Sequence, residues 1–263
     1  MGTLDGRQAL ITGGTTGLGL AIARRFVGEG ADVVITGRDA ELGELAEHQL
    51  AGAGRARFIQ ADAADPAQVA QSVRATVEEL GGLGILVNNA GVGIVAGVLE
   101  TPLADYDRVM DVNVRGAFCY AQTAFPHLER AGGCIVNVAS DAGVIGEDDI
   151  GVYSVSKAAL IMLSNMLAVE GGRRGVRSNA VCPGDTEPGM RHMSAPGQPE
   201  RPDDVASWPL PPVGRVGAAA DVAETVLFLA SEAAAFVNGI AMLVDGGMRA
   251  GMRTATYADG SRR

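Results

Sequence analysis

Two residues spaced for proton transfer lie in the stretch Tyr153-Ser154-Val155-Ser156-Lys157. Residues four apart on a helix share one face, so a helix here would bring the Tyr153 phenol near the Lys157 ammonium. A free phenol has a pKa of about 10, and a nearby positive charge lowers it because it favours the phenolate. We therefore predict a phenol that gives a proton to a carbonyl oxygen, or takes one from an alcohol, near neutral pH. Ordinary amphipathic helices also carry this pair, so its meaning depends on the rest of the chain.

A glycine-rich turn near the N-terminus has the context of a phosphate-binding loop. The apolar run 8–12 predicts a buried strand, and residues 20–26 predict a helix. The turn between them reads Gly13-Gly14-Thr15-Thr16-Gly17-Leu18-Gly19. Glycines let backbone N–H groups approach a pyrophosphate, and the helix N-terminus adds positive potential. The Gly-x-x-x-Gly-x-Gly spacing differs from the commonest dinucleotide fingerprint, so the strand and helix on either side support the prediction more than the spacing does.

Strands and helices are expected to alternate along the chain, which predicts an α/β protein. The expected strands are residues 8–12, 31–36, 57–60, 84–87, 134–138, 177–181 and 241–244. The expected helices after the first are 40–50, 66–80, 105–128, 153–170 and 220–230, with Asp39 and Asp65 as N-caps. This order predicts a Rossmann-type, doubly wound parallel sheet of about seven strands with helices on both faces. Ligands bind such sheets at the carboxyl ends of the strands.

No linker or internal repeat interrupts this pattern, so residues 1–263 are interpreted as one dinucleotide-binding and catalytic domain. Residues 185–214 are rich in proline, glycine and charge and are expected to form a substrate flap. They include His192 and Trp208, to which we assign no role. The C-terminal tail, 248–263, is polar and basic, and its role is also open.

Composition limits the partners and the compartment. The formal net charge of -10 argues against nucleic acid and anionic membranes as partners. No uninterrupted apolar run is long enough to span a bilayer, and no signal peptide is expected. The three cysteines, an odd number without a close pair, fit a reducing, cytoplasmic location. The three histidines have no cysteine at ligand spacing, so no metal site is proposed.

With these pieces placed, the chain resembles the short-chain dehydrogenase/reductase family over nearly its whole length. The resemblance is carried by short motifs that occur in the family's order: Thr12-Gly13-x-x-x-Gly17-x-Gly19, Asn88-Asn89-Ala90-Gly91, Asn113, Ser140, Tyr153-x-x-x-Lys157, Pro183-Gly184 and Val244-Asp245-Gly246-Gly247. The family transfers a hydride between a nicotinamide cofactor and a carbonyl or alcohol. The cofactor supplies the hydride, and the protein supplies position and electrostatics.

The resemblance implies a role for each matching residue. Tyr153 would be the general acid/base, Lys157 would bind the nicotinamide ribose and lower the tyrosine pKa, and Ser140 would orient the substrate oxygen. Asn113 would hold a water that continues the proton path, and Asn88 would tie strands together. The residues expected to contact the cofactor are Gly13, Thr15, Thr16, Gly17, Leu18, Gly19, Arg38, Asp62, Ala63, Asn89, Ala90, Gly91, Tyr153, Lys157, Pro183, Gly184 and Thr186.

The residues after the second and the sixth expected strands predict which cofactor is preferred and which residue contacts its carboxamide. The second strand ends at Gly37 rather than at an acidic residue that would select NAD(H), and Arg38 follows with a guanidinium suited to a 2′-phosphate. NADP(H) is therefore expected to be preferred, with NAD(H) still possible because of neighbouring Asp39. After the sixth strand, Pro188 stands where family members often have a threonine, so Thr186 is the candidate for the carboxamide contact.

The sequence is compatible with three functions. The first is an NADP(H)-linked carbonyl reductase or alcohol dehydrogenase acting on a small or medium organic molecule. The second is a 3-oxoacyl carrier-protein reductase, with Arg130, Arg173 and Arg174 as docking charges or simply as solvated cations. The third is a non-catalytic dinucleotide sensor or scaffold. A homo-oligomer, most simply a tetramer, is implied by the resemblance alone, and the substrate itself is not predicted.

Overall fold

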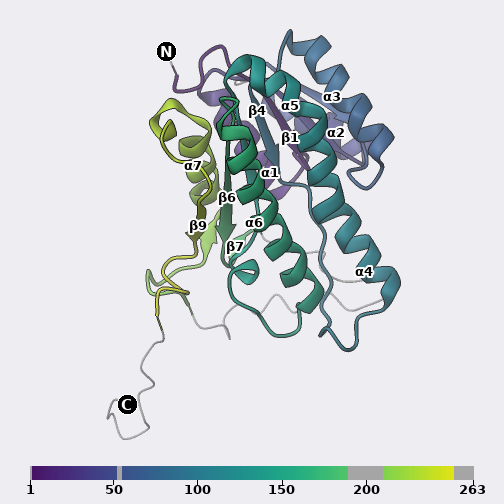
Figure 1. Ribbon diagram of the computed structural model, residues 1–263, viewed down its shortest axis with the longest axis vertical. Helices are drawn as coiled ribbons and strands as arrows, with labels where there is room; N and C mark the ends of the chain where they lie inside the picture. Colours follow the sequence, from purple (N-terminus) through teal and green to yellow (C-terminus); the bar gives the residue numbers. More distant parts are fainter. Residues whose placement is uncertain (1, 52–54, 189–209, 252–263) are drawn as a thin grey trace, which may run out of the picture.

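A seven-stranded sheet, parallel throughout, runs through the residues that the computed structural model describes, which are 2–51, 55–188 and 210–251 (Figure 1). The strand order is β3–β2–β1–β4–β5–β6–β9. The bounds are Gln8–Thr12 for β1, Asp32–Gly37 for β2, Ala56–Gln60 for β3, Ile85–Asn88 for β4, Cys134–Val138 for β5, Arg177–Pro183 for β6 and Ala241–Val244 for β9. Chain order reverses between β1 and β4, which creates the crevice where doubly wound sheets bind ligands. The predicted fold is confirmed.

The central strands are mainly apolar because both faces of the sheet are covered. In β1, Ala9 and Ile11 pack into one core, while Leu10 between them packs into the other. The same alternation occurs in β5, where Cys134 and Val136 face the first core and Ile135 the second. A continuous apolar run of this kind therefore forms a central strand, and its carboxyl end is held rigidly between two helical layers.

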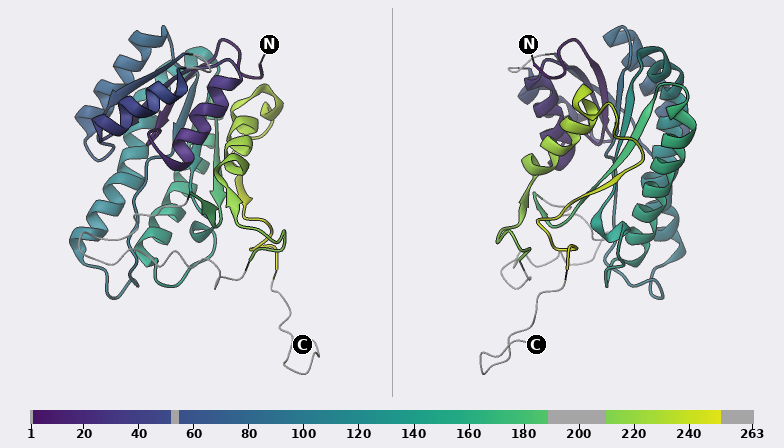
Figure 2. Two further views of the ribbon diagram at one scale, coloured as in Figure 1. Left: turned by 180° about the vertical axis from the view of Figure 1, so that it is seen from behind. Right: turned by 60° about the vertical axis from the view of Figure 1, so that its left-hand side comes forward.

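Helices cover both faces, as the two views of Figure 2 show. Helices α1 (Gly17–Gly28), α2 (Ala40–Leu50) and α7 (Ala219–Ala230) contribute to the first core. The second core is built from α3 (Pro66–Leu80) and α5 (Ala117–Ala131), and α6 (Gly151–Gly172) packs on the same side. The predicted N-caps are confirmed: the Asp39 carboxylate accepts from the Leu42 amide at 3.0 Å, and the Asp65 carboxylate accepts from the Ala67 amide at 2.8 Å.

The long helix expected over 105–128 is continuous but not regular. It consists of α4 (Leu103–Met110), a π-helical turn η1 (Asp111–Gly116) and α5. A π turn holds one residue more than an α turn and is common at functional sites. Asn113, a predicted site residue, lies in this turn and is fully buried.

Helix α6 is apolar on nearly all sides. Within the described part of the chain it is the helix that is long and apolar enough to cross a membrane, and 44% of its most apolar window is buried in the protein. Its inner face packs beside β5 and β6, and it carries Tyr153 and Lys157. These contacts identify α6 as a core helix. Its outer face leaves a group of apolar side chains exposed: Val155, Met162, Met166 and Val169.

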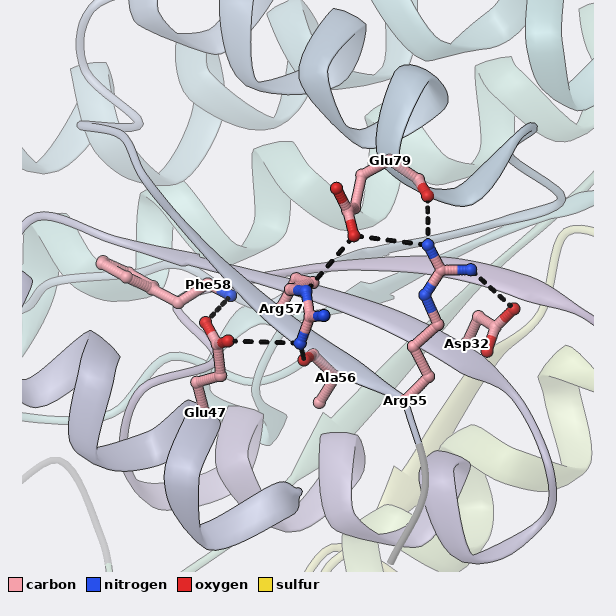
Figure 3. Close-up of polar contacts among 7 residues, drawn as sticks. All are labelled: Asp32, Glu47, Arg55, Ala56, Arg57, Phe58 and Glu79. Carbon is pink, nitrogen blue, oxygen red and sulfur yellow. Dashed lines mark hydrogen bonds and ion pairs between the residues drawn. The ribbon is translucent and has the colours of Figure 1, made fainter.

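The two edges of the sheet differ in chemistry. The β3 edge is covered by charge: Arg57 Nε donates to Glu79 at 3.2 Å, and Glu47 accepts from the free amide of Phe58 at 2.7 Å (Figure 3). Charged side chains on an edge strand prevent pairing with another chain. The β9 edge instead presents Leu243, and Phe236, before β9 in the chain, is fully exposed.

The flap and the tail are described only in part, because residues 189–209, with His192 and Trp208, and 252–263 lie outside the described residues. Before the gap, Thr186–Glu187 forms a short strand, β7, that pairs in parallel with β8, Gly217–Ala218. This pairing was not predicted. Residues 245–250 follow β9 and turn back over the carboxyl edge of the sheet: Gly184, at the end of β6, packs against Asp245.

Candidate active site

The turn after β1 packs tightly against the end of β4. Gly13 has a φ of +62°, and a Cβ added there would lie 2.9 Å from the Cα of Ala90. The Thr12 hydroxyl accepts from the amides of Asn89 and Ala90 at 3.0 and 2.9 Å, and the Asn89 side chain donates to the carbonyls of Thr12 and Gly13. The predicted motifs at 12–19 and 88–91 therefore lie side by side at the carboxyl edge.

The N-terminus of α1 fits a pyrophosphate. Its N-cap, Thr16, makes no side-chain cap, and no acidic residue occupies the first turn. The amides there are thus left for another acceptor, and the helix dipole favours an anion. Gly17 has a φ of +53°, and among the described residues a Cβ added there would meet only the Pro188 carbonyl oxygen, at 3.9 Å. Thr15, Leu18 and Gly19 complete the turn, and Gly19 packs against the Gly13 carbonyl.

The end of β2 is compact and ends in an exposed arginine. A Cβ at Gly37 would lie 2.7 Å from the Thr15 methyl, so a larger residue would clash with the turn. The Arg38 side chain is exposed and has no ion-pair partner among the described residues. Asp39, which left NAD(H) open as a cofactor, is engaged as the N-cap of α2.

The ends of β3 and β4 place the remaining adenine-side and ribose-side residues. The Asp62 carboxylate accepts from the Ala64 amide at 2.9 Å, and Ala63 packs against Gly116 in the π turn. Asn88 donates to the side chain of Asn137 on β5 at 2.9 Å, which confirms its predicted role in tying strands together. A Cβ at Gly91 would lie 3.3 Å from Lys157 Nζ and 3.4 Å from Asn113 Oδ1. Gly91 therefore joins the cofactor side of the site to its proton-transfer side.

Asn113 is held by three hydrogen bonds. It accepts from the Val92 amide at 2.8 Å and donates to the Val92 carbonyl at 2.8 Å and to Ser156 Oγ at 2.9 Å. The side chain thus fixes the loop after β4 to helix α6. The predicted water on Asn113 stays a prediction.

Tyr153 and Lys157 share a buried face of α6, as predicted: Lys157 Nζ lies 5.5 Å from the centre of the Tyr153 ring and donates to the Val138 carbonyl at 2.9 Å. The predicted direction of the phenol pKa is wrong for the protein chain itself. Burial raises the pKa of Tyr153 to about 12, with a smaller lowering from a hydrogen bond to Ser140. Burial also lowers the pKa of Lys157 to about 8. Spacing alone could not reveal this, because the cost of removing a charge from water depends on tertiary packing.

Ser140 lies at the end of β5, against the phenol. Its hydroxyl accepts from the Ala142 amide at 3.2 Å and lies 3.3 Å from Asp141 Oδ1. Cys182, on the neighbouring β6, is buried, and burial followed by the charge of Asp141 raises its pKa to about 11. The four predicted catalytic residues, Asn113, Ser140, Tyr153 and Lys157, are thus brought together by η1, β5 and α6.

The nicotinamide-side residues lie at the end of β6. Pro183 is buried, and the Gly184 amide donates to the Val244 carbonyl at 3.1 Å. The Thr186 hydroxyl donates to the Gly184 carbonyl at 2.9 Å, which places it beside the predicted Pro183-Gly184 turn. The cofactor contacts of these three residues stay a prediction.

Two residues at the site were not predicted. The first is Asp141, which is buried. Its position directly after Ser140 could have marked it in the sequence. Arg249 comes from the C-terminal segment and binds Asp141 at 3.0 Å and Glu147 at 3.1 Å. No local motif marks Arg249. Glu147, in the loop before α6, is therefore an ion-pair partner of Arg249. In the described segments, no three His, Cys, Asp or Glu side chains gather at metal-binding distance.

Comparisons with known proteins agree with this geometry. A family model described as enoyl-(acyl carrier protein) reductase matches residues 13–249. The 2-(R)-hydroxypropyl-CoM dehydrogenase of Xanthobacter autotrophicus is 42% identical over 246 residues, which cover 91% of this chain and 97% of that protein. The NADP-dependent (R)-specific alcohol dehydrogenase of Lentilactobacillus kefiri is 34% identical, over 94% of this chain and 98% of that protein.

The fold is matched as well. A crystal structure described as a putative short-chain alcohol dehydrogenase from Sinorhizobium meliloti superposes with a TM-score of 0.86 at 32% sequence identity. The match covers 95% of this chain and 98% of that one. The match thus includes the sheet and the carboxyl edge where the site lies.

Proposed function

The chain belongs to the short-chain dehydrogenase/reductase family, and from this premise we propose that it transfers a hydride between NADP(H) and a small secondary alcohol or its ketone. Enzymes named for such chemistry, acting on hydroxypropyl-CoM, butanediol and threitol, are among its relatives. The observation that carries the proposal is the buried contact of Ser140, Tyr153 and Lys157 beside a glycine-rich turn whose helix N-terminus has no side-chain cap.

The residues divide the chemistry among them. The nicotinamide, when bound, supplies or accepts the hydride. Tyr153 gives its proton to the carbonyl oxygen during reduction and takes it from the alcohol during oxidation. Because burial keeps the phenol protonated near pH 7, Tyr153 is ready as an acid, and oxidation should become faster as the pH rises. Ser140 holds the substrate oxygen against the phenol, and Lys157 binds the ribose hydroxyls next to Gly91.

The preference for NADP(H) rests on the end of β2. Gly37 offers no carboxylate to the adenine ribose, and Asp39 is used as a helix cap. Arg38 is exposed, without an ion-pair partner among the described residues, and can meet a 2′-phosphate with a charge-assisted pair of hydrogen bonds. An NADP-dependent relative supports this assignment.

The carrier-protein alternative loses support at its docking charges. Arg174 forms a two-pronged ion pair with Glu129 at 2.6 and 2.7 Å, and Arg130 binds His127 and a helix carbonyl. Of the three candidate arginines, only Arg173 has no such partner among the described side chains. The sensor alternative also loses support, because a protein that only binds the cofactor does not need a proton-transfer pair such as the buried Tyr153 and Lys157.

A substrate screen tests the proposal. Purified protein is mixed with NADPH and a panel of ketones, and with NADP⁺ and the matching alcohols, while cofactor absorbance is followed. Turnover of free ketones supports the proposal. Turnover that requires an acyl carrier protein supports the second reading, and cofactor binding without any turnover supports the sensor. Tyr153→Phe serves as the matched inactive control.

We also propose that the chain acts as a single domain in a homo-oligomer, most simply a tetramer. The outer face of α6 exposes Val155, Met162 and Met166, and the β9 edge exposes Leu243. Exposed apolar faces of this kind favour subunit contacts. Light scattering at micromolar concentration tests this, and a monomer would contradict it.

Three free cysteines support a reducing, cytoplasmic location.

A further inference from the structure

We propose that Arg249, in the segment after the last strand, is a positioning residue that neutralises Asp141 and so frees Ser140 and Tyr153 for proton transfer. This inference rests on the proposed function, because it concerns the same site. It adds a contribution from a part of the chain that no motif connects with the chemistry. Arg249 acts through Asp141 and is not itself assigned a contact with the substrate.

The contacts form a short relay of three side chains. Arg249 Nε donates to Asp141 Oδ2 at 3.0 Å, and the other oxygen, Asp141 Oδ1, lies 3.3 Å from the Ser140 hydroxyl. The second arm of the guanidinium donates to Glu147 Oε2 at 3.1 Å. The Asp141 side chain is only 10% exposed and that of Arg249 20% exposed. At this burial an ion pair is weakly screened, so losing one partner has a large effect.

The backbone holds Arg249 in this place. The Asp245 carboxylate accepts from the Gly247 amide at 2.9 Å and from the Arg249 amide at 2.8 Å. Gly246 and Gly247 adopt positive φ values, which reverse the chain after β9. Asp245 also packs against Gly184, beside the end of β6. The arginine is therefore presented to the site by a fixed turn.

The charges around the phenol explain why neutralisation matters. From the loop after β5, the carboxylates of Asp141 and Glu147 both raise the pKa of Tyr153. Lys157 faces the phenol from α6, Cys182 lies near Lys157 and Asp141 on β6, and Asp245 lies near Asp141 after β9. Arg249 is the cation that binds both carboxylates.

Without Arg249, two effects are expected at the site. The full charge of Asp141 would make its carboxylate a stronger acceptor for the Ser140 hydroxyl, which would compete with the substrate oxygen. The same charge would disfavour the phenolate that takes the proton from an alcohol. Both effects slow alcohol oxidation, and the second one does so in a pH-dependent way.

The experiment compares Arg249→Met, Arg249→Lys, Asp141→Asn and the double variant Arg249→Met/Asp141→Asn. Arg57→Met, which removes an arginine from the exposed ion pairs of the β3 edge, is the matched control (Figure 3). The readout is kcat/KM for alcohol oxidation against pH, with saturating NADP⁺. In Arg249→Met, the pH at which kcat/KM rises should be about one unit higher than in the wild type. At a fixed pH below this rise, kcat/KM should therefore fall about tenfold. Arg249→Lys should restore most of the loss, because it keeps the charge.

Asp141→Asn should make Arg249 less important for the proton transfer. The double variant should show its rise closer to the wild-type pH than Arg249→Met does, since of the two carboxylates that raise the pKa of Tyr153 only Glu147 remains. Arg57→Met should leave the profile unchanged. A merely structural role for Arg249 would lower kcat at all pH values without moving the profile. The inference is overturned by an Arg249→Met profile that superimposes on that of the wild type, or by a double variant shifted as far as Arg249→Met.

A second readout does not depend on turnover. Thermal unfolding of the wild type, Arg249→Met, Asp141→Asn and the double variant forms a double-mutant cycle, in which the Tm losses of the two single variants should not add. Additive losses would overturn the pairing of Arg249 with Asp141. If the wild type turns over nothing in the substrate panel, the proposed function fails, and the cycle still decides whether the two side chains are coupled.

Discussion

The molecule places charge in two contrasting regions, the carboxyl edge of the sheet and the β3 edge. At the carboxyl edge, Lys157 is buried and donates to a backbone carbonyl, and the Asp141–Arg249 pair is almost covered. At the β3 edge, Arg55 and Arg57 bind the acidic residues Asp32, Glu47 and Glu79 in the open (Figure 3).

The difference between these regions is solvation. The side chains of Arg57 and Glu79 are 51% and 39% exposed, so water and salt screen their attraction. Lys157 is 3% exposed, and burial moves its pKa from 10.5 to about 8. Similar charged groups therefore protect an edge strand in one place and set proton affinities in the other. The following changes test this contrast, from the largest expected effect to the smallest.

Removing the phenol oxygen should have the largest effect. Tyr153→Phe keeps the ring and its packing but cannot transfer a proton, so kcat should fall by roughly 10²- to 10⁴-fold. Cofactor binding, measured by NADPH fluorescence, should be nearly unchanged. A variant that keeps more than a tenth of the wild-type kcat would remove Tyr153 from the acid/base role.

Arg38 tests whether an exposed charge becomes important when a ligand covers it. Arg38→Ala should lower kcat/KM for NADPH by about 10- to 150-fold, since a charge-assisted phosphate contact contributes roughly 1.5–3 kcal/mol. The value for NADH should change little. Arg74→Ala, which removes an exposed arginine on α3, is the control. Equal losses with both cofactors, or a wild type that uses NADH as well as NADPH, would contradict the assignment.

Lys157 should lower stability while it supports activity. Its folded-state pKa of about 8 lies below the unfolded value, so the protonated side chain opposes folding fully below pH 8. Between about pH 8 and 10.5 the unfolded state holds a proton that the folded state has lost, and the cost disappears as the pH rises. Lys157→Met should therefore be inactive, yet more stable at pH 7 by about 1–2 kcal/mol once the lost hydrogen bond is deducted.

Urea unfolding at pH 7 and at pH 9.5 measures this effect. The gain of Lys157→Met over the wild type should be largest at pH 7 and smaller at pH 9.5. A variant that is less stable than the wild type at pH 7 would show that the hydrogen bond to Val138 outweighs the cost of burying the charge. Ser156→Ala is unsuitable as a control, because Ser156 holds Asn113.

The smallest effect is expected at the β3 edge. Glu79→Gln removes one partner of Arg55 and Arg57 in the open, so the free energy of unfolding should change by less than about 1 kcal/mol. kcat/KM should be unchanged. A loss comparable to that of a buried ion pair would break the contrast between the two regions.

The sequence predicted most where local chemistry decides the structure. Asp65 followed by Pro66 marks the start of α3 to the residue, and apolar runs bounded by glycine or asparagine mark β1, β4 and β5. Motifs at the carboxyl ends of the strands brought Gly13, Asn89, Ser140 and Tyr153 to one edge because parallel topology requires it.

The features that were missed depend on distance in the chain or on burial. Arg249 meets Asp141 across 108 residues, and no period or motif links them. The direction of the Tyr153 pKa depends on how completely packing removes water from the phenol. The β7–β8 pair is only two residues long on each side, too short to show a pattern of alternation.

The π turn at Asp111–Gly116 makes the site sensitive to chain length in a way that side-chain chemistry does not show. A π turn has one surplus residue compared with an α turn, so deleting one residue from 111–116 would restore a regular helix. A deletion just before Asn113 would also rotate its side chain by about 100° around the helix axis relative to α4. The amide would then leave Val92 and Ser156, which lie on a neighbouring loop and helix. A single-codon deletion in this helix should therefore abolish catalysis while the protein still folds.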